Sequence, residues 1–149
     1  MHNVFKFGRR QFRAAAVLIL FPVVSGVSVA SADGQGETPY KVVCEGEKPV
    51  CKVDKGTYKG WRTYHAVCHV CHAQDAVGST FAPSLVDRLK GMDKEKFMDV
   101  VLNGFTGEVG VMPGWKEDPN VLPRMEDLWG YLKARSDGVL SPGKPRKLP

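Results

Sequence analysis

Five consecutive residues constrain this chain more than any others: Cys68, His69, Val70, Cys71 and His72. Two thiols three positions apart, followed at once by an imidazole, form the attachment signature of a c-type haem. On one helical turn both thiols lie on the same side, and each can add to one vinyl group of a single porphyrin. His72 then lies beneath the iron and can serve as its proximal ligand. The motif predicts a chain that folds around one covalently attached haem c.

Two other kinds of site use a similar pair of cysteines. A thioredoxin-like redox pair lies near a βαβ pattern, and no such pattern surrounds Cys68 in the sequence. A tetrahedral zinc site needs a second pair of ligands. The haem is therefore the favoured interpretation.

The first 32 residues have the composition of an export signal. A segment with four basic residues precedes an apolar stretch over 14–24, and a small-residue cleavage site ends at Ala32. The apolar stretch is too short for a confident transmembrane helix. Arg9 and Arg10 also fit a twin-arginine signal, so the export route stays open. We expect a periplasmic protein that is cleaved after Ala32 and has no stable membrane anchor.

Cleavage changes the charge balance of the chain. The full chain has 21 basic and 16 acidic residues, and removal of the four basic residues of the signal leaves 17 and 16. The high pI therefore gives no support for nucleic-acid binding. Residues 33–143 alone carry 14 basic and 16 acidic side chains. We expect little electrostatic bias when a partner protein docks, and an apolar contact around Val111, Pro113 and Trp115. The alternative is that a ring of lysines, namely Lys59, Lys90 and Lys116, makes the contact.

The 117 residues after the signal support one domain. We divide them into an N-terminal extension over 33–53, a haem domain over 54–138 and an extended tail over 139–149. Apolar residues recur at helical spacing up to Cys68. Further helices are expected over 85–89, from the N-cap Asp93 to Asn103, and from about Pro123 to Asp137. This pattern predicts an all-α fold of three to five helices wrapped around one haem.

The iron either takes a second axial ligand opposite His72 or keeps that coordination position open. His65 and His69 lie on the helix of His72, cannot reach the other haem face, and are expected to be solvated. Met112 lies 40 residues after His72 in a Gly- and Pro-rich loop, where Pro113 favours an extended backbone. A His72–Met112 pair saturates the iron and favours electron transfer over catalysis. The alternatives are an open site, a lysine, or another methionine, of which the mature chain has Met92, Met98 and Met125.

A second cysteine pair precedes the haem motif. Cys44 and Cys51 flank a turn, and export places them in an oxidising compartment. A disulfide between them would close an eight-residue loop and stabilise the fold by about 2.5 kcal/mol. A redox-active or metal-binding pair is the alternative.

The order of several short motifs resembles the class I cytochromes c over about residues 54–137. The resemblance implies that the first and last helices cross, with Gly60 and Tyr64 meeting Leu128 and Tyr131. It also implies that the Pro83 carbonyl accepts a hydrogen bond from His72. Trp61 and Trp115 are then either core aromatics or donors to a haem propionate. The motifs are Gly60-x-x-x-Tyr64, Cys68-x-x-Cys71-His72, Pro83-x-Leu85, Asn103-Gly104, Met112-Pro113 and 127–133.

The extra cysteine pair and the runs 53–58 and 81–83 narrow this resemblance. They are similar to the four-cysteine cytochromes c related to methanol metabolism, which resemble the soluble electron acceptors of PQQ-dependent methanol and ethanol dehydrogenases. The resemblance implies a monomeric electron carrier, not an enzyme, that takes electrons from such a dehydrogenase and passes them to a downstream cytochrome or oxidase. The competing function is an open-site haem protein, either a peroxidase or a gas sensor.

Overall fold

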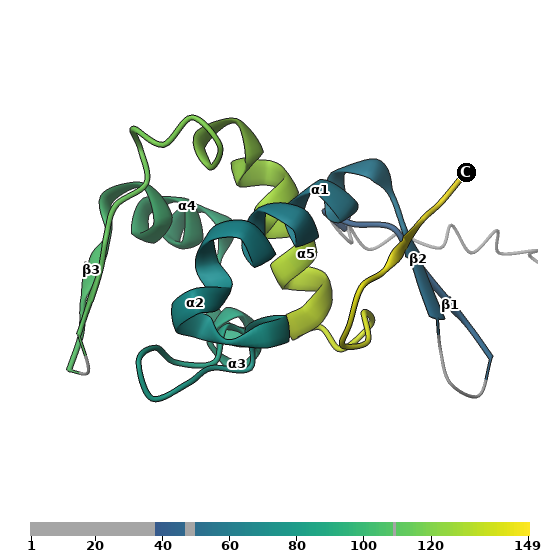
Figure 1. Ribbon diagram of the computed structural model, residues 1–149, viewed down its shortest axis with the longest axis horizontal. Helices are drawn as coiled ribbons and strands as arrows, with labels where there is room; N and C mark the ends of the chain where they lie inside the picture. Colours follow the sequence, from purple (N-terminus) through teal and green to yellow (C-terminus); the bar gives the residue numbers. More distant parts are fainter. Residues whose placement is uncertain (1–37, 47–49, 109) are drawn as a thin grey trace, which may run out of the picture. The chain divides into compact units, whose positions relative to one another are not determined.

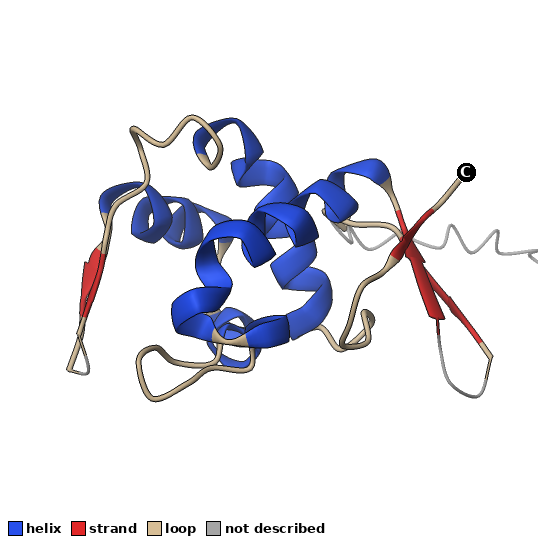
Figure 2. Ribbon diagram, in the orientation of Figure 1, coloured by secondary structure: helices blue, strands red, loops and turns tan. Residues whose placement is uncertain are grey.

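The computed structural model describes residues 38–46, 50–108 and 110–149, and the predicted export signal lies outside them. Three helices form the larger part of the fold (Figures 1 and 2): α1 (Lys55–Thr63), α4 (Lys94–Asn103) and α5 (Met125–Ser136). Helix α1 continues through a π-helical turn, η1 (Tyr64–Cys68), into α2 (His69–His72). The shorter elements are α3 (Leu85–Arg88) and the 3₁₀ turns η2 (Gln74–Ala76), η3 (Leu89–Gly91) and η4 (Leu122–Arg124).

Short strands accompany these helices, so the all-α prediction is wrong in that respect. Strands β1 (Val42–Glu45) and β2 (Val50–Val53) form an antiparallel hairpin, and β5 (Arg146–Lys147) pairs in parallel with β2. A second hairpin joins β3 (Phe105–Thr106) to β4 (Val111–Met112). The valines of the first hairpin favour strands, and β2 leaves a free edge that the C-terminal segment can pair with. The N-terminal extension and the tail thus meet in one small sheet.

The core lies where α1 crosses α5 (Figure 1). Tyr64 and Tyr131 are fully buried, with ring centroids 5.5 Å apart. Phe97 of α4 packs against Trp129 of α5 at a centroid distance of 5.2 Å. Leu128 is also buried here. No helix of the described chain is long and apolar enough to cross a membrane.

Asp54 begins α1 as its N-cap. Its carboxylate accepts hydrogen bonds from the backbone N–H of Thr57 at 2.9 Å, from the Thr57 hydroxyl at 2.6 Å and from the backbone N–H of Lys41 at 2.7 Å. Burial alone would raise the pKa of Asp54, but these hydrogen bonds outweigh it and hold the pKa below its usual range. The cap therefore anchors the haem-motif helix to the N-terminal extension.

We expect Asp54→Ala to lower the free energy of unfolding by about 1 kcal/mol at neutral pH. Because the folded-state pKa is lowered, the charged carboxylate stabilises the fold above the ordinary pKa of about 4. That contribution is lost as the pH falls through the folded-state pKa. Urea unfolding of both proteins across acidic and neutral pH measures the difference. Asp54→Asn, which keeps a capping oxygen, is the control, and a pH-independent difference for Asp54→Ala would contradict the role of the charge.

Cys44 and Cys51 form a disulfide between directly opposed positions of β1 and β2, as predicted. Replacing both by Ser should lower the free energy of unfolding by about 2.5 kcal/mol, because the unfolded chain loses a constraint. Urea unfolding of the variant and of the oxidised wild type measures this. The visible haem spectrum should stay unchanged, since the pair lies outside the haem motif. An altered spectrum would mean that the pair takes part in the haem site.

Candidate functional site

The haem motif lies at the end of the long helical run. Cys68 ends the π turn, and both Cys71 and His72 belong to α2. Both thiols are free, with Cys68 half-buried and Cys71 exposed. Nδ1 of His72 lies 2.9 Å from the carbonyl oxygen of Pro83. Because a carbonyl only accepts, Nδ1 carries the proton and Nε2 keeps its lone pair. His72 is therefore in the tautomer that a metal-binding histidine needs.

The thiols differ from those of a redox pair or a zinc site. Burial, and then the neighbouring Cys71, raise the pKa of Cys68 to about 12. Redox-active and metal-binding cysteines need the opposite shift, because the thiolate is the reactive form. Among the described residues, no group of three or more His, Cys, Asp or Glu side chains could hold a metal ion. A cysteine sulfur that is bonded to a haem vinyl carbon as a thioether no longer titrates and need not bind a metal, so neither observation argues against haem attachment.

The segment after His72 has an unusual backbone. Ala73, Asp75 and Ala76 have φ angles of 61°, 57° and 67°, which residues other than glycine seldom adopt. The Tyr64 hydroxyl donates to the Ala73 carbonyl at 2.5 Å, and Nε of the buried Arg135 donates to the Asp75 carbonyl at 3.3 Å. Such a backbone persists where its surroundings hold it. Sequence reasoning missed this support, because alanine carries no signal for positive φ.

Met112 lies in β4, opposite Phe105, and is partly buried. Two glycines let its loop approach the end of α4. A Cβ at Gly104 would lie 2.6 Å from the Met112 carbonyl oxygen, and one at Gly114 would lie 2.7 Å from the carbonyl oxygen of Leu102. The loop that carries Met112 is therefore held against α4 by close backbone contacts. Of the four methionines, Met125 is buried in the core, and Met92, Met98 and Met112 are partly buried and pack against it.

At the predicted crossing of α1 and α5, the closest contact of Gly60 is to a residue that was not predicted. A Cβ at Gly60 would lie 1.9 Å from the carbonyl oxygen of Asp127 and 2.9 Å from Cβ of Tyr131. Leu128 lies in the adjoining core. Side-chain patterns cannot point to Asp127, because the atom in contact belongs to its backbone.

His65 and Trp61 lie together beside the haem motif. The side chain of His65 is only 14% exposed, so the expectation of a solvated histidine is wrong. Its Nδ1 lies 2.9 Å from the Trp61 carbonyl oxygen, and the two rings are in contact. The buried indole N–H of Trp61 has no acceptor among the described residues. An unpaired buried donor fits a haem propionate as its acceptor, which stays a prediction.

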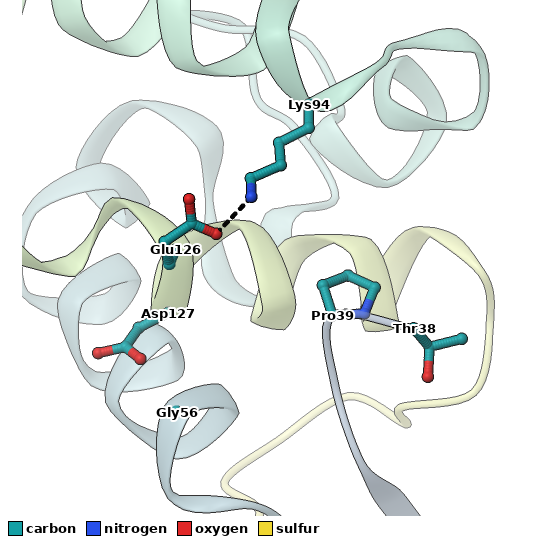
Figure 3. A pocket seen from close by; sticks show the side chains of 6 residues that line it. All are labelled: Thr38, Pro39, Gly56, Lys94, Glu126 and Asp127. Carbon is teal, nitrogen blue, oxygen red and sulfur yellow. Dashed lines mark ion pairs between the residues drawn. The ribbon is translucent and has the colours of Figure 1, made fainter. Parts of the chain in front are cut away.

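The protein also has an open surface hollow, shown in Figure 3. Its lining residues are Thr38, Pro39, Gly56, Lys94, Glu126 and Asp127. Lys94 pairs with Glu126 across it at 2.7 Å. None of the cysteine, histidine or methionine side chains discussed above lines this hollow, so it is separate from the candidate site.

Comparison with known proteins identifies the family. Residues 57–130 match the family described as cytochrome C oxidase, cbb3-type, subunit III. The chain is also 35% identical over 96 residues to cytochrome c-555 of Methylococcus capsulatus. The matched region is 64% of this chain and 75% of that protein. The chain is a class I c-type cytochrome. Its family membership confirms covalently attached haem c as the cofactor and the helical cytochrome c fold.

Two further relatives support this assignment. Cytochrome c-553I of Paracoccus denitrificans is 38% identical over 112 residues, 72% of this cytochrome. The matched region is 47% of that relative, so this cytochrome spans about half its length. The crystal structure of the c-type cytochrome XoxG from Methylobacterium extorquens AM1 matches with a TM-score of 0.62 and 43% sequence identity. That match covers 66% of this cytochrome and 62% of the XoxG chain.

Proposed function

We propose that this cytochrome carries single electrons in the periplasm from a PQQ-dependent methanol or alcohol dehydrogenase to a downstream cytochrome or oxidase. The observation that carries the proposal is the state of His72. Its Nδ1 lies 2.9 Å from the Pro83 carbonyl oxygen, so Nδ1 carries the proton and the lone pair of Nε2 is left for iron. Met112, on a loop held against α4, is the proposed second ligand.

Each residue of the site has a distinct role in this proposal. Cys68 and Cys71 hold the haem through thioethers, while His72 and Met112 bind the iron. When bound, the haem supplies an iron that accepts one electron in the ferric state and releases it from the ferrous state. The Pro83 carbonyl orients the His72 ring and raises its basicity. Two protein ligands leave no open position for a substrate, which favours electron transfer rather than catalysis at the iron.

The proposed location and donor rest on separate features. The sequence of residues 1–32 favours export, and the Cys44–Cys51 disulfide is typical of an oxidising compartment. The donor is supported by the resemblance to four-cysteine cytochromes of methanol metabolism. The 43% identity to XoxG of a Methylobacterium adds to that support.

Stopped-flow reduction of the purified ferric holoprotein tests the donor. A PQQ-dependent methanol dehydrogenase or ethanol dehydrogenase, supplied with its alcohol, should reduce one haem per protein rapidly. The same enzyme without alcohol is the control. Rapid reduction by another physiological donor, with none by either dehydrogenase, would overturn the proposed donor and leave electron transfer standing.

A further inference from the structure

The backbone leaves the helical conformation directly after His72. Helix α2 ends there, and Ala73 has a φ of 61° and a ψ of 175°, a region that is almost restricted to glycine. Asp75 and Ala76 also have positive φ angles, of 57° and 67°. Residues 73–76, which we call the left-handed turn, therefore have a backbone that alanine and aspartate disfavour. Contacts with other segments must hold it in place.

Two side chains from other segments hold the left-handed turn. The hydroxyl of the fully buried Tyr64 donates to the Ala73 carbonyl at 2.5 Å. Nε and Nη2 of Arg135 donate to the Asp75 carbonyl at 3.3 and 3.2 Å, and Nη1 donates to the Leu140 carbonyl. Arg135 is only 7% exposed. Because these acceptors of the guanidinium are backbone carbonyls from two segments, the side chain fixes the path of the backbone.

The left-handed turn returns the chain to the haem motif. The backbone N–H of Gly78 donates to the His72 carbonyl at 2.9 Å, and the Ser79 hydroxyl donates to the Cys71 carbonyl. Gly78 also lies close to Pro83, since an added Cβ would lie 2.9 Å from the Pro83 carbonyl carbon. The turn and its exit therefore determine where the Pro83 carbonyl lies.

The Pro83 carbonyl in turn acts on the imidazole of His72. It accepts the hydrogen bond of Nδ1 at 2.9 Å, and such a bond fixes both the ring orientation and the direction of Nε2. A continuous chain of contacts thus leads from Tyr64 and Arg135, through the left-handed turn, to the nitrogen that faces the iron.

We propose that Tyr64 and Arg135 are positioning residues for His72; this inference rests on the proposed role of His72 as an iron ligand. By holding the left-handed turn, the two side chains place the Pro83 carbonyl, and that carbonyl sets the orientation of the imidazole. Both residues act through backbone carbonyls of the turn. A ligand whose orientation is locked by its surroundings keeps its geometry, which suits an iron that gains and loses an electron repeatedly.

Tyr64→Phe and Arg135→Lys in the full holoprotein test the proposal. The first removes only a hydroxyl, and the second keeps the positive charge but replaces three donor nitrogens by one. Each is also combined with Ala73→Gly, because glycine adopts a positive φ without support. Tyr40→Phe is the matched control, since its hydroxyl donates to the Asp137 carboxylate at 2.8 Å and not to the turn.

Two measurements report on the two ends of this chain of contacts. The g values of the ferric haem in electron paramagnetic resonance depend on the orientation of the axial imidazole. Amide hydrogen exchange at Gly78 reports on opening of the turn, because its N–H donates to the His72 carbonyl. Tyr64→Phe and Arg135→Lys should shift the g values and speed the exchange at Gly78 at least about tenfold. Tyr40→Phe should change neither.

The combination with Ala73→Gly separates positioning from core packing. In both Tyr64→Phe and Arg135→Lys, the glycine should restore the wild-type g values and slow the exchange at Gly78. A residue that only fills the core would not be rescued by a glycine in the turn, so failure of the rescue would overturn the proposal. Wild-type g values in both single variants would overturn it as well. If Arg135→Lys does not retain haem, Tyr64→Phe and its combination with Ala73→Gly decide alone.

Neither measurement involves a dehydrogenase, so the proposed function fails by different results. A wild type that no dehydrogenase reduces would overturn the proposed donor and leave the positioning role in place. A high-spin signal from the ferric wild type would overturn the proposed pair of axial ligands, and the positioning role with it. A low-spin wild type whose variants are not rescued by glycine would overturn the positioning role alone.

Discussion

Met112→Ala should abolish the weak long-wavelength band that a methionine–iron bond gives to the ferric protein. The reduction potential should fall by on the order of 0.1 V or more, since axial ligands set haem potentials over about 0.8 V. The physical reason is that methionine, with histidine, raises the haem reduction potential. Spectroscopy and a redox titration of the purified holoprotein measure the two effects. The variant should also bind carbon monoxide when reduced, because its iron has an open position.

Met92→Ala is the matched control for this experiment. Met92 is also a partly buried methionine packed against the core, and it lies in the connector before α4. Its replacement should keep the band and the potential. Loss of the band in Met92→Ala, with its retention in Met112→Ala, would reassign the ligand. A wild type that binds carbon monoxide readily would instead favour the open-site haem protein.

Gly60→Ala should lower the free energy of unfolding by about 2–3 kcal/mol, the usual cost of overpacking a tight contact. The added Cβ would lie 1.9 Å from the Asp127 carbonyl oxygen. That oxygen belongs to the backbone of α5, so it cannot rotate away and the two helices must separate. Helix propensity acts in the opposite direction, since alanine is favoured over glycine by about 1 kcal/mol inside a helix. Urea unfolding of the holoprotein decides which effect is larger.

Gly91→Ala provides the comparison for the helix crossing. No atom lies within 4 Å of a Cβ added at Gly91, and its φ is not in the left-handed region. Its replacement should leave the stability nearly unchanged. A Gly60→Ala protein as stable as wild type, or more stable, would show that α1 and α5 do not pack as closely as the structure has them.

Short-range sequence patterns predicted much of the helical fold. Asp93 caps α4 as the sequence predicts, and Asp54 caps α1 in the same way. Each carboxylate accepts a hydrogen bond from the backbone N–H three residues later. The hydrogen bond between His72 and Pro83 was implied by family resemblance, and the structure has it at 2.9 Å. These features depend on residues close together in the sequence or on a motif with fixed spacing.

Other features depend on contacts between distant segments. The tail reads as an extended segment with three prolines, yet Arg146 and Lys147 pair with β2 because that strand has a free edge. The positive φ angles of Ala73 and Ala76 have no sequence signal. They are supported by Tyr64, which lies nine residues earlier, and by Arg135, which lies 60 residues after Asp75.

The haem chemistry follows from local sequence: two thiols and an imidazole at fixed spacing predict haem attachment, and one helical turn is enough to bring them together. The support of that chemistry depends on the tertiary structure. The left-handed turn after His72, the contact of Gly60 with a backbone carbonyl and the pairing of β5 with β2 all arise between segments far apart in the chain. Such contacts follow from packing and from the pairing of free backbone groups, which local residue patterns do not specify.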